Sequence, residues 1–196
     1  RMIRGEDVSG DHFDNAALMF IDIVGFTSHT SHMPPSNVVK LLENIFRTLD
    51  ALCDEHNVVK IKTVGDSYMC FRGDADASTN ALSVARVALA VLQHPGTWPT
   101  GEPLHVRIGI HIGPATAGVI GTQRLQYDLW GDTVNVASRM ESTSEPGRIH
   151  ISEALAKALN EALSKALNEA YIVPRGTMDI KGKGMMQTYW LESPLS

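Results

Sequence analysis

Residues 16–22 read Ala-Ala-Leu-Met-Phe-Ile-Asp, and this short stretch decides the fold prediction. Six apolar residues in a row, without polar alternation, are typical of a strand that is buried on both faces. An acid follows the run directly, at Asp22. We therefore expect a central strand of a sheet, with a carboxylate at the point where the chain leaves the core.

The chain downstream of this strand alternates between helical and strand patterns. Ser36 is a good N-cap for a first helix, in which apolar residues recur every three or four positions. Val64-Gly65-Asp66 reads as a hairpin turn, which places Asp66 at a tip. The predicted order is a strand at 16–21, a helix at 36–52, strands at 58–63 and 67–72, a helix at 76–93 and a strand at 105–112. This order is the ferredoxin-like βαββαβ pattern of an α+β fold, an antiparallel sheet with helices on one face.

The residues beyond this core predict additional C-terminal strands and helices. The segment 155–162 is nearly repeated at 163–170, and both copies are strongly helix-forming. We expect a hairpin from 117–121 and 126–130, a helix at 132–142, a strand at 171–174 and a last strand near 188–191. The predicted organisation is one domain over residues 16–196, preceded by a linker or truncated lead-in at residues 1–15.

Composition excludes several classes of partner. The net charge of −5 and the pI near 5.9 argue against nucleic acid, which binds basic surfaces. No apolar run approaches the roughly 18 residues of a membrane helix, so we expect no membrane contact by this domain. Cys53 and Cys70 have no CxxC spacing, and they indicate neither a zinc site nor a disulfide framework. We expect a cytoplasmic domain, in a parent protein that is either soluble or membrane-bound.

Two acids at the ends of neighbouring predicted strands indicate a metal site. Asp22 and Asp66 lie side by side if the first strand neighbours the hairpin, as the ferredoxin-like order places it. Mg²⁺ prefers a few carboxylates together with waters and substrate phosphates. Either acid alone is as readily explained as a turn residue, but the two together favour a metal. Just after Asp22, the backbone N–H groups of Gly25, Phe26 and Thr27 are available to phosphate oxygens.

Four motifs in order resemble the catalytic domain of class III adenylyl and guanylyl cyclases. They are Phe20-Ile-Asp-Ile-Val-Gly-Phe-Thr27, Lys60-Ile-Lys-Thr-Val-Gly-Asp-Ser-Tyr-Met69, Gln126-Tyr-Asp-Leu-Trp-Gly-Asp-Thr-Val-Asn-Val-Ala-Ser-Arg-Met140 and Lys181-Gly-Lys-Gly184. The resemblance runs from about Ala17 to Leu191, and the duplicated segment 155–170 fits it poorly.

The resemblance implies a role for each matching residue. Asp22, Asp66 and the Ile23 carbonyl would hold two Mg²⁺ or Mn²⁺ ions per active site, and the ribose 3′-hydroxyl would attack the α-phosphate and expel pyrophosphate. Arg139 would stabilise the transition state, and Asn135 would orient the ribose. Phosphate binding would fall to the following residues: Gly25, Phe26, Thr27, Arg107 and Lys181.

The base would be selected by Lys62 and Asp128. Adenine offers an acceptor at N1 and a donor at N6, which match a lysine and an aspartate, whereas guanylyl cyclases resembling this chain usually carry Glu and Cys there. The resemblance therefore implies an adenylyl cyclase that converts ATP to cyclic AMP. The alternatives are a guanylyl cyclase, which Lys62 and Asp128 disfavour, and a catalytically silent regulatory module. Such a module is expected to have lost a metal acid or the arginine.

Cyclases of this type build each active site from two subunits, one giving the metal acids and the other the base, ribose and transition-state residues. Both sets are present in this chain. The resemblance therefore implies a homodimer with two shared active sites.

Overall fold

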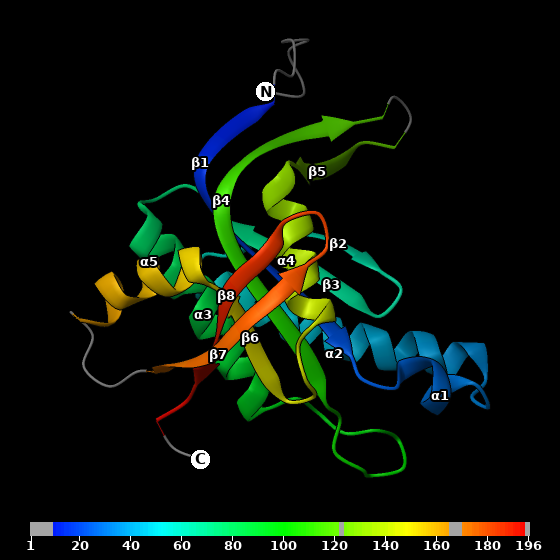
Figure 1. The fold of residues 1–196 in the computed structure, drawn as a ribbon. Coiled ribbons are helices and arrows are strands. Elements are labelled where there is room, and N and C mark those ends of the chain that lie inside the picture. The colour runs from blue at the N-terminus through cyan, green and yellow to red at the C-terminus, as the bar shows by residue number, and fades with distance from the viewer. Residues whose placement is uncertain (1–9, 122–123, 165–169, 195–196) are drawn as a thin grey trace.

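The computed structural model describes residues 10–121, 124–164 and 170–194. They form an eight-stranded sheet with the strand order β2-β3-β1-β4-β6-β8-β7, and β5 pairs with the far end of β4 (Figure 1). The strands are β1 (Asp11–Ile23), β2 (Val59–Val64), β3 (Ser67–Arg72), β4 (Val106–Ile120), β5 (Gln126–Trp130), β6 (Arg148–Ser152), β7 (Tyr171–Ile180) and β8 (Gly184–Glu192). The helices are α1 (Phe26–Thr30), α2 (Pro35–Glu55), α3 (Ala77–Gln93), α4 (Asp132–Ser142) and α5 (Glu153–Leu163). The predicted βαββαβ core of an α+β fold is confirmed.

The apolar run of β1 lies at the centre of the sheet. It pairs antiparallel with β3 on one side and with β4 on the other, and residues 16–19 are completely buried. In this register Asp22 stands opposite Ser67 on β3 and Arg107 on β4. The end of β1 therefore meets both the β2–β3 turn and the start of β4.

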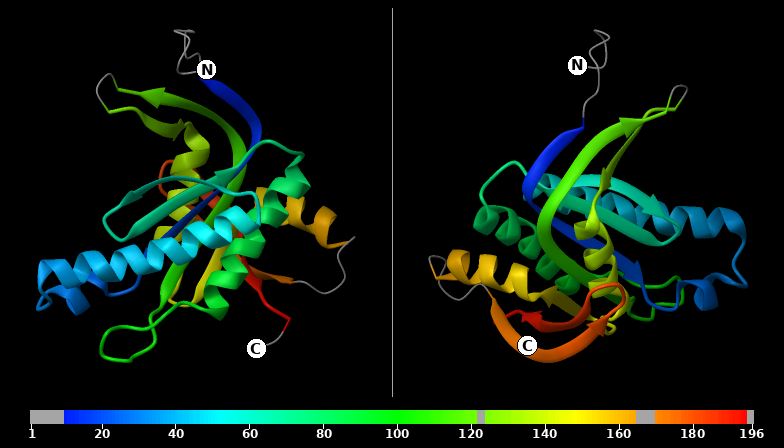
Figure 2. Two further views of the ribbon diagram at one scale, coloured as in Figure 1. Left: turned by 180° about the vertical axis from the view of Figure 1, so that it is seen from behind. Right: turned by 45° about the horizontal axis from the view of Figure 1, so that its top comes forward.

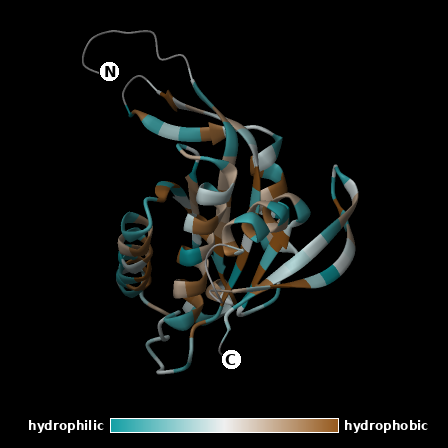
Figure 3. Cartoon of the chain, turned by 90° about the vertical axis from the view of Figure 1, so that its left-hand side faces the viewer, coloured by the Kyte–Doolittle hydropathy of each residue, from teal (hydrophilic) through white to brown (hydrophobic). Residues whose placement is uncertain are grey.

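Helices cover the two faces of the sheet unequally. The main core contains buried residues of α2, α3 and α5 together with the strands, and Figure 2 shows α2 and α3 on the same side. A smaller core on the opposite face holds Ala137 of α4 against Leu18 and Ala115. Figure 3 shows both hydrophobic and hydrophilic residues on the helices, as expected for helices that pack one face against a sheet.

Several boundaries differ from the sequence prediction. β1 begins at Asp11, so residues 11–15, assigned to the lead-in, continue the strand that pairs with β4; residues 1–9 lie outside the described part. The N-cap of α2 is Pro34, not Ser36, and a second proline at N1 has the φ angle that a helix requires.

The later elements also differ from the prediction. β4 runs unbroken to Ile120, so the predicted strand at 117–121 is its distal end. β6 was not predicted, because its strand conformation depends on pairing with β4 and β8, which are distant in sequence. Of the predicted helix over 155–170, α5 accounts for residues up to Leu163, and residues 165–169 lie outside the described chain.

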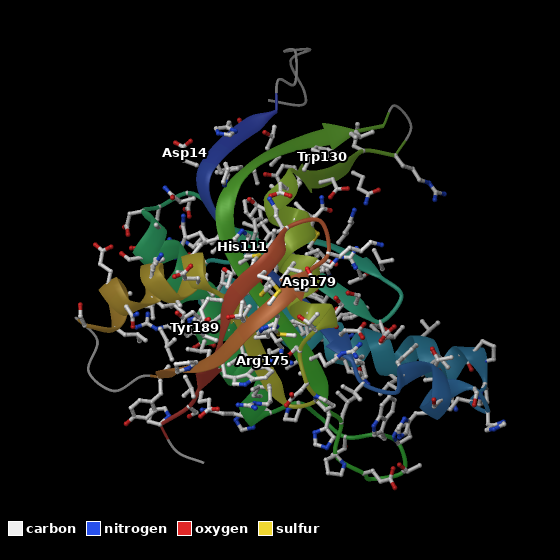
Figure 4. All side chains as sticks on the ribbon, viewed as in Figure 1. Asp14, His111, Trp130, Arg175, Asp179 and Tyr189 are labelled. Atoms are coloured by element: carbon white, nitrogen blue, oxygen red, sulfur yellow. The ribbon has the colours of Figure 1, made fainter. Side chains whose placement is uncertain are left out.

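The distal half of β4 and β5 form an arm that leaves the body of the sheet. Its described residues include three large apolar side chains, Ile120, Leu125 and Trp130, which are 60%, 60% and 39% exposed. Figure 4 shows Trp130 on this arm. Three large exposed apolar side chains on one arm are candidates for contact with another protein. Among the described helices, none is long and apolar enough to cross a membrane.

His150, on β6, is a buried titratable group. Its Nδ1 lies 2.9 Å from the carbonyl oxygen of Met140, while Nε2 has no hydrogen-bond partner in the described part of the chain. Burial lowers the pKa of His150 from 6.5 to about 4. The folded protein therefore holds this ring neutral at a pH where the unfolded chain protonates it.

This histidine predicts a loss of stability in mild acid. A depressed folded-state pKa contributes stability above pH 6.5 that is lost as the pH falls toward 4, up to about 2 kcal/mol between pH 7 and pH 5. Urea unfolding at several pH values measures this loss. His150→Asn keeps a neutral donor near Met140, so its free energy of unfolding should depend less on pH. Equal pH dependence in the two proteins would show that His150 does not contribute.

Candidate active site

Asp22 and Asp66 lie together at one end of the central strands. Asp22 is the second-to-last residue of β1, and Asp66 is in the tight turn between β2 and β3. Both line a hollow of about 240 Å³ at the edge of the sheet. The same hollow is lined by the other residues predicted to act here, Ile23, Gly25, Phe26, Thr27 and Arg107. The structure thus brings together every residue that the sequence assigned to the metal acids and the phosphate loop.

The electrostatics of this hollow suit a cation. Burial and then the neighbouring charge of Asp22 raise the pKa of Asp66. Arg107 donates from Nη2 to Asp22 Oδ2 over 2.9 Å, so one arginine partly balances the two acids. Two carboxylates and a backbone carbonyl are hard oxygen ligands, the kind that Mg²⁺ prefers. Within the described ranges no cluster of three or more His, Cys, Asp and Glu side chains is placed to hold a metal. The donor set therefore fits an ion that takes its remaining ligands from water and substrate.

The loop after β1 turns at Gly25, whose φ of 69° lies in the left-handed region that glycine adopts without strain. The five-residue helix α1 starts directly after it. His29 fixes this turn from the far side, since its Nδ1 lies 2.9 Å from the Gly25 carbonyl oxygen. The His29 ring also stacks on Trp98, with 4.2 Å between the ring centroids. This stack was not predicted, because the two residues are far apart in the chain.

α4 lies beside the turn that joins β7 to β8 (Figure 1). Residues of both line a second hollow. Its volume is about 530 Å³, and it is lined by Asn135, Arg139 and Lys181. Asn135 and Arg139 share a face of α4 because they are four residues apart. At the rim, Lys183 forms an ion pair with Asp132. Asn135, Arg139 and Lys181, predicted to act on the ribose, the transition state and the triphosphate, thus line one hollow. Arg107, the other residue predicted to act on the triphosphate, lines the first hollow.

Lys62 and Asp128 form an ion pair with each other, with Nζ 2.7 Å from Oδ2. Their side chains are 31% and 18% exposed. A bulge in the β2–β3 pairing between Lys60 and Lys62 explains how Lys62 reaches this position. Lys60 contacts Asp50 on the α2 side, and the extra residue turns Lys62 toward β5 on the other side. No pattern in the sequence indicates this bulge.

Glu141 is the site residue that the sequence analysis missed. It lies on α4, and its side chain is only 12% exposed. Its Oε1 is 3.4 Å from Arg107 Nε, next to the metal acids. Burial first, and then the charge of Asp22, raise the pKa of Glu141 to about 7. A signal was available, because Glu141 continues at four-residue spacing the buried row that contains Thr133 and Ala137.

The two hollows are separate within one chain, and they share no lining residue. The metal acids, the phosphate loop and Arg107 belong to the first, which we call the metal half-site. Asn135, Arg139 and Lys181 belong to the second, the α4 half-site. A single chain therefore does not bring its predicted catalytic residues into one cavity.

The family assignment follows from comparison with known proteins. The model of the adenylate and guanylate cyclase catalytic domain matches residues 8–193. The chain belongs to this family. Guanylate cyclase 2G of Rattus norvegicus is 41% identical over 197 residues, which cover 97% of this chain and 18% of that protein. The chain thus spans less than a fifth of the length of this relative.

Solved structures confirm the cyclase fold. The catalytic core of a rhodopsin-guanylyl cyclase with converted specificity, in complex with ATPαS, superposes with a TM-score of 0.85 and 34% identity, over 94% of this chain and 98% of that one. The adenylyl cyclase CyaB from P. aeruginosa superposes with a TM-score of 0.81 and 26% identity, over 93% and 95% of the two chains. Both guanylyl and adenylyl cyclases are therefore among its structural neighbours.

Proposed function

We propose that this cyclase domain is an adenylyl cyclase that converts ATP to cyclic AMP and pyrophosphate. The observation that carries the choice of ATP is the Lys62–Asp128 pair, which offers a donor and an acceptor 2.7 Å apart. Adenine presents the complementary acceptor at N1 and donor at N6. Guanine presents a carbonyl at O6 and N–H groups at N1 and N2, so each of its edge groups would meet a partner of its own kind. A site built for one hydrogen-bond pattern rejects the other strongly.

Guanylyl cyclase is the second candidate, because the curated relative with 41% identity is a guanylate cyclase. Identity over the whole domain reflects mainly the fold and the shared phosphate chemistry. The base is read by few side chains, and in this chain those are Lys62 and Asp128. The rhodopsin-guanylyl cyclase core with converted specificity, bound to ATPαS, illustrates that such a scaffold accommodates an adenine nucleotide. The two side chains that would face the base therefore decide the substrate, and both favour ATP.

Each residue of the two half-sites would have its own role in the reaction. Asp22, Asp66 and the Ile23 carbonyl would hold two Mg²⁺ or Mn²⁺ ions. When bound, such ions lower the pKa of the ribose 3′-hydroxyl and stabilise charge on the α-phosphate. The backbone of Gly25, Phe26 and Thr27 cradles phosphate oxygens. Arg107 and Lys181 neutralise the triphosphate, Asn135 orients the ribose, and Arg139 stabilises the transition state with its fixed fork of donors.

Two copies of the chain would complete each active site. The separation of the metal half-site from the α4 half-site supports this assembly, because neither hollow alone holds all the residues that the reaction needs. The exposed apolar residues of the β4–β5 arm, Ile120, Leu125 and Trp130, offer a surface for the second copy. A symmetric dimer would create two equivalent sites. The nucleotide substrate and the two free cysteines favour a cytoplasmic location.

Product analysis tests this proposal. The purified domain is incubated with ATP and Mn²⁺, and the product is identified by mass spectrometry. We expect cyclic AMP, with a specific activity that falls on dilution as the dimer dissociates. The absence of any cyclic product at protein concentrations that favour the dimer would support a silent regulatory module instead.

A further inference from the structure

Glu141 lies on the helix of one half-site but faces the other. It follows Arg139 by two residues, which turns its side chain about 200° around α4. Arg139 lines the α4 half-site, whereas the side chain of Glu141 is directed at the start of β4 and is largely buried. Gly109 allows this approach, because a Cβ there would lie 1.9 Å from the Glu141 backbone nitrogen. The close packing of α4 on β4 therefore places a carboxylate behind the metal half-site.

Arg107 stands between this carboxylate and Asp22. Its Nη2 donates to Asp22 over 2.9 Å, while its Nε lies 3.4 Å from Glu141 Oε1. Both Arg107 Nε and Glu141 Oε1 are buried and lack a hydrogen-bond partner among the described residues. The two atoms form an ion pair with each other, but its geometry falls short of a hydrogen bond. A small shift of the guanidinium toward Glu141 would turn this ion pair into a hydrogen bond.

We propose that Glu141 is a positioning residue of the metal half-site of its own chain, acting through Arg107. The inference rests on the proposed function, and it assigns Glu141 to the opposite half-site from its neighbour Arg139. A cation at the metal half-site competes with Arg107 for the Asp22 carboxylate. Glu141 gives Arg107 a second acceptor, which frees Asp22 and keeps the guanidinium beside the phosphate loop.

Without Glu141, Asp22 is the one carboxylate partner left to Arg107 in the part of the chain that the structure describes. The arginine then opposes cation binding, and the site also loses a nearby negative charge. Both effects weaken the binding of a cation. We expect Glu141→Gln to bind Mn²⁺ about 10-fold more weakly, the lower end of what loss of an outer-shell partner costs a metal site.

Mn²⁺ binding is measured directly, without turnover, from the electron paramagnetic resonance signal of the free ion. Glu145→Gln is the matched control, because Glu145 is an exposed acid four residues further along that pairs with Arg148 and Arg175. It should bind Mn²⁺ like the unmodified chain. Because the effect runs through Arg107, Glu141→Gln should weaken Mn²⁺ binding less in an Arg107→Gln background. Unchanged affinity in Glu141→Gln would overturn the proposal.

Mixed dimers distinguish this role from simple support of Arg139. A Glu141→Ala chain mixed with an Arg139→Ala chain leaves one site with an intact metal half-site and an intact Arg139, so activity should recover. Mixed with an Asp66→Ala chain, it leaves both sites with a damaged metal half-site, and no recovery is expected. If Glu141 only supports Arg139, the mixture with Arg139→Ala should stay inactive and the mixture with Asp66→Ala should recover activity.

The reference pair is Asp66→Ala with Arg139→Ala. In one outcome that pair recovers activity, and Glu141→Ala, like Arg139→Ala, recovers activity only when mixed with Asp66→Ala. The proposed role of Glu141 would then be wrong, whereas the proposal of shared active sites would be supported. If the reference pair fails to recover, the shared sites themselves are wrong, and the Mn²⁺ titration alone decides the role of Glu141. Thermal unfolding is compared first. If Glu141→Gln is unstable, Glu141→Asp replaces it, with weakened Mn²⁺ binding expected because the shorter side chain is further from Arg107.

Discussion

Chains carrying Asp66→Ala and Arg139→Ala should each lose activity by at least about 10³-fold, because one removes a metal carboxylate and the other a transition-state donor. Mixed in equal amounts, the two inactive chains should recover up to about a quarter of normal activity. Half of the dimers would be mixed, and each mixed dimer would have one complete site of two. Steady-state rates of the equal mixture, measured without separating the dimers, give the recovery.

The control for this experiment is a mixture in which both changes fall in the same half-site. Asp22 and Asp66 line the same hollow. Mixed dimers of an Asp22→Ala chain and an Asp66→Ala chain therefore have no intact metal half-site and should stay inactive. Recovery in the control, or its absence in the Asp66 and Arg139 pair at all ratios, would contradict shared sites.

The second large effect concerns the base. The double substitution Lys62→Glu and Asp128→Cys should lower kcat/KM for ATP by at least about 10², and GTP should become the preferred substrate. Glutamate accepts from guanine N1 and N2, and the thiol is a weak donor to O6. Rates with each nucleotide, measured on the same preparation, give the change.

Lys62→Glu alone is an informative comparison, because it places a second carboxylate beside Asp128, where the lysine now lies 2.7 Å away. That chain should be poor with both nucleotides. Lys60→Gln is the matched control, since Lys60 is on the same strand but pairs with Asp50 toward α2. Its preference between ATP and GTP should not change. If the double variant kept a preference for ATP, Lys62 and Asp128 would not be the residues that select the base.

Sequence patterns predicted the core of the fold because its signals are local. The apolar run of β1, the helical spacing of α2 and α3 and the Gly65-Asp66 turn each lie within one element, and the structure reproduces them. β6 and the full length of β4 escaped prediction for a different reason. Whether a five-residue segment or a distal extension forms a strand depends on partners distant in sequence, as when β6 pairs with β4 and β8.

Part of the candidate site could also be predicted from the sequence. Asp22 and Asp66 could be placed together from strand order alone, and the resemblance supplied Asn135, Arg139 and Lys181. The β2 bulge that turns Lys62 toward Asp128 could not be predicted, because it depends on the register against β3. Glu141 was also missed, because its proximity to Arg107 follows from the close packing of α4 on Gly109.

One measurement tests the central claim most directly: competition between equal concentrations of ATP and GTP for a single preparation of the unmodified domain with Mg²⁺ or Mn²⁺. The ratio of cyclic AMP to cyclic GMP formed at early times equals the ratio of the two kcat/KM values. We predict that cyclic AMP exceeds cyclic GMP by at least about 10-fold, since guanine leaves both Lys62 and Asp128 without a matching partner. A ratio at or below one, with cyclic GMP formed readily, would contradict the assignment and identify a guanylyl cyclase.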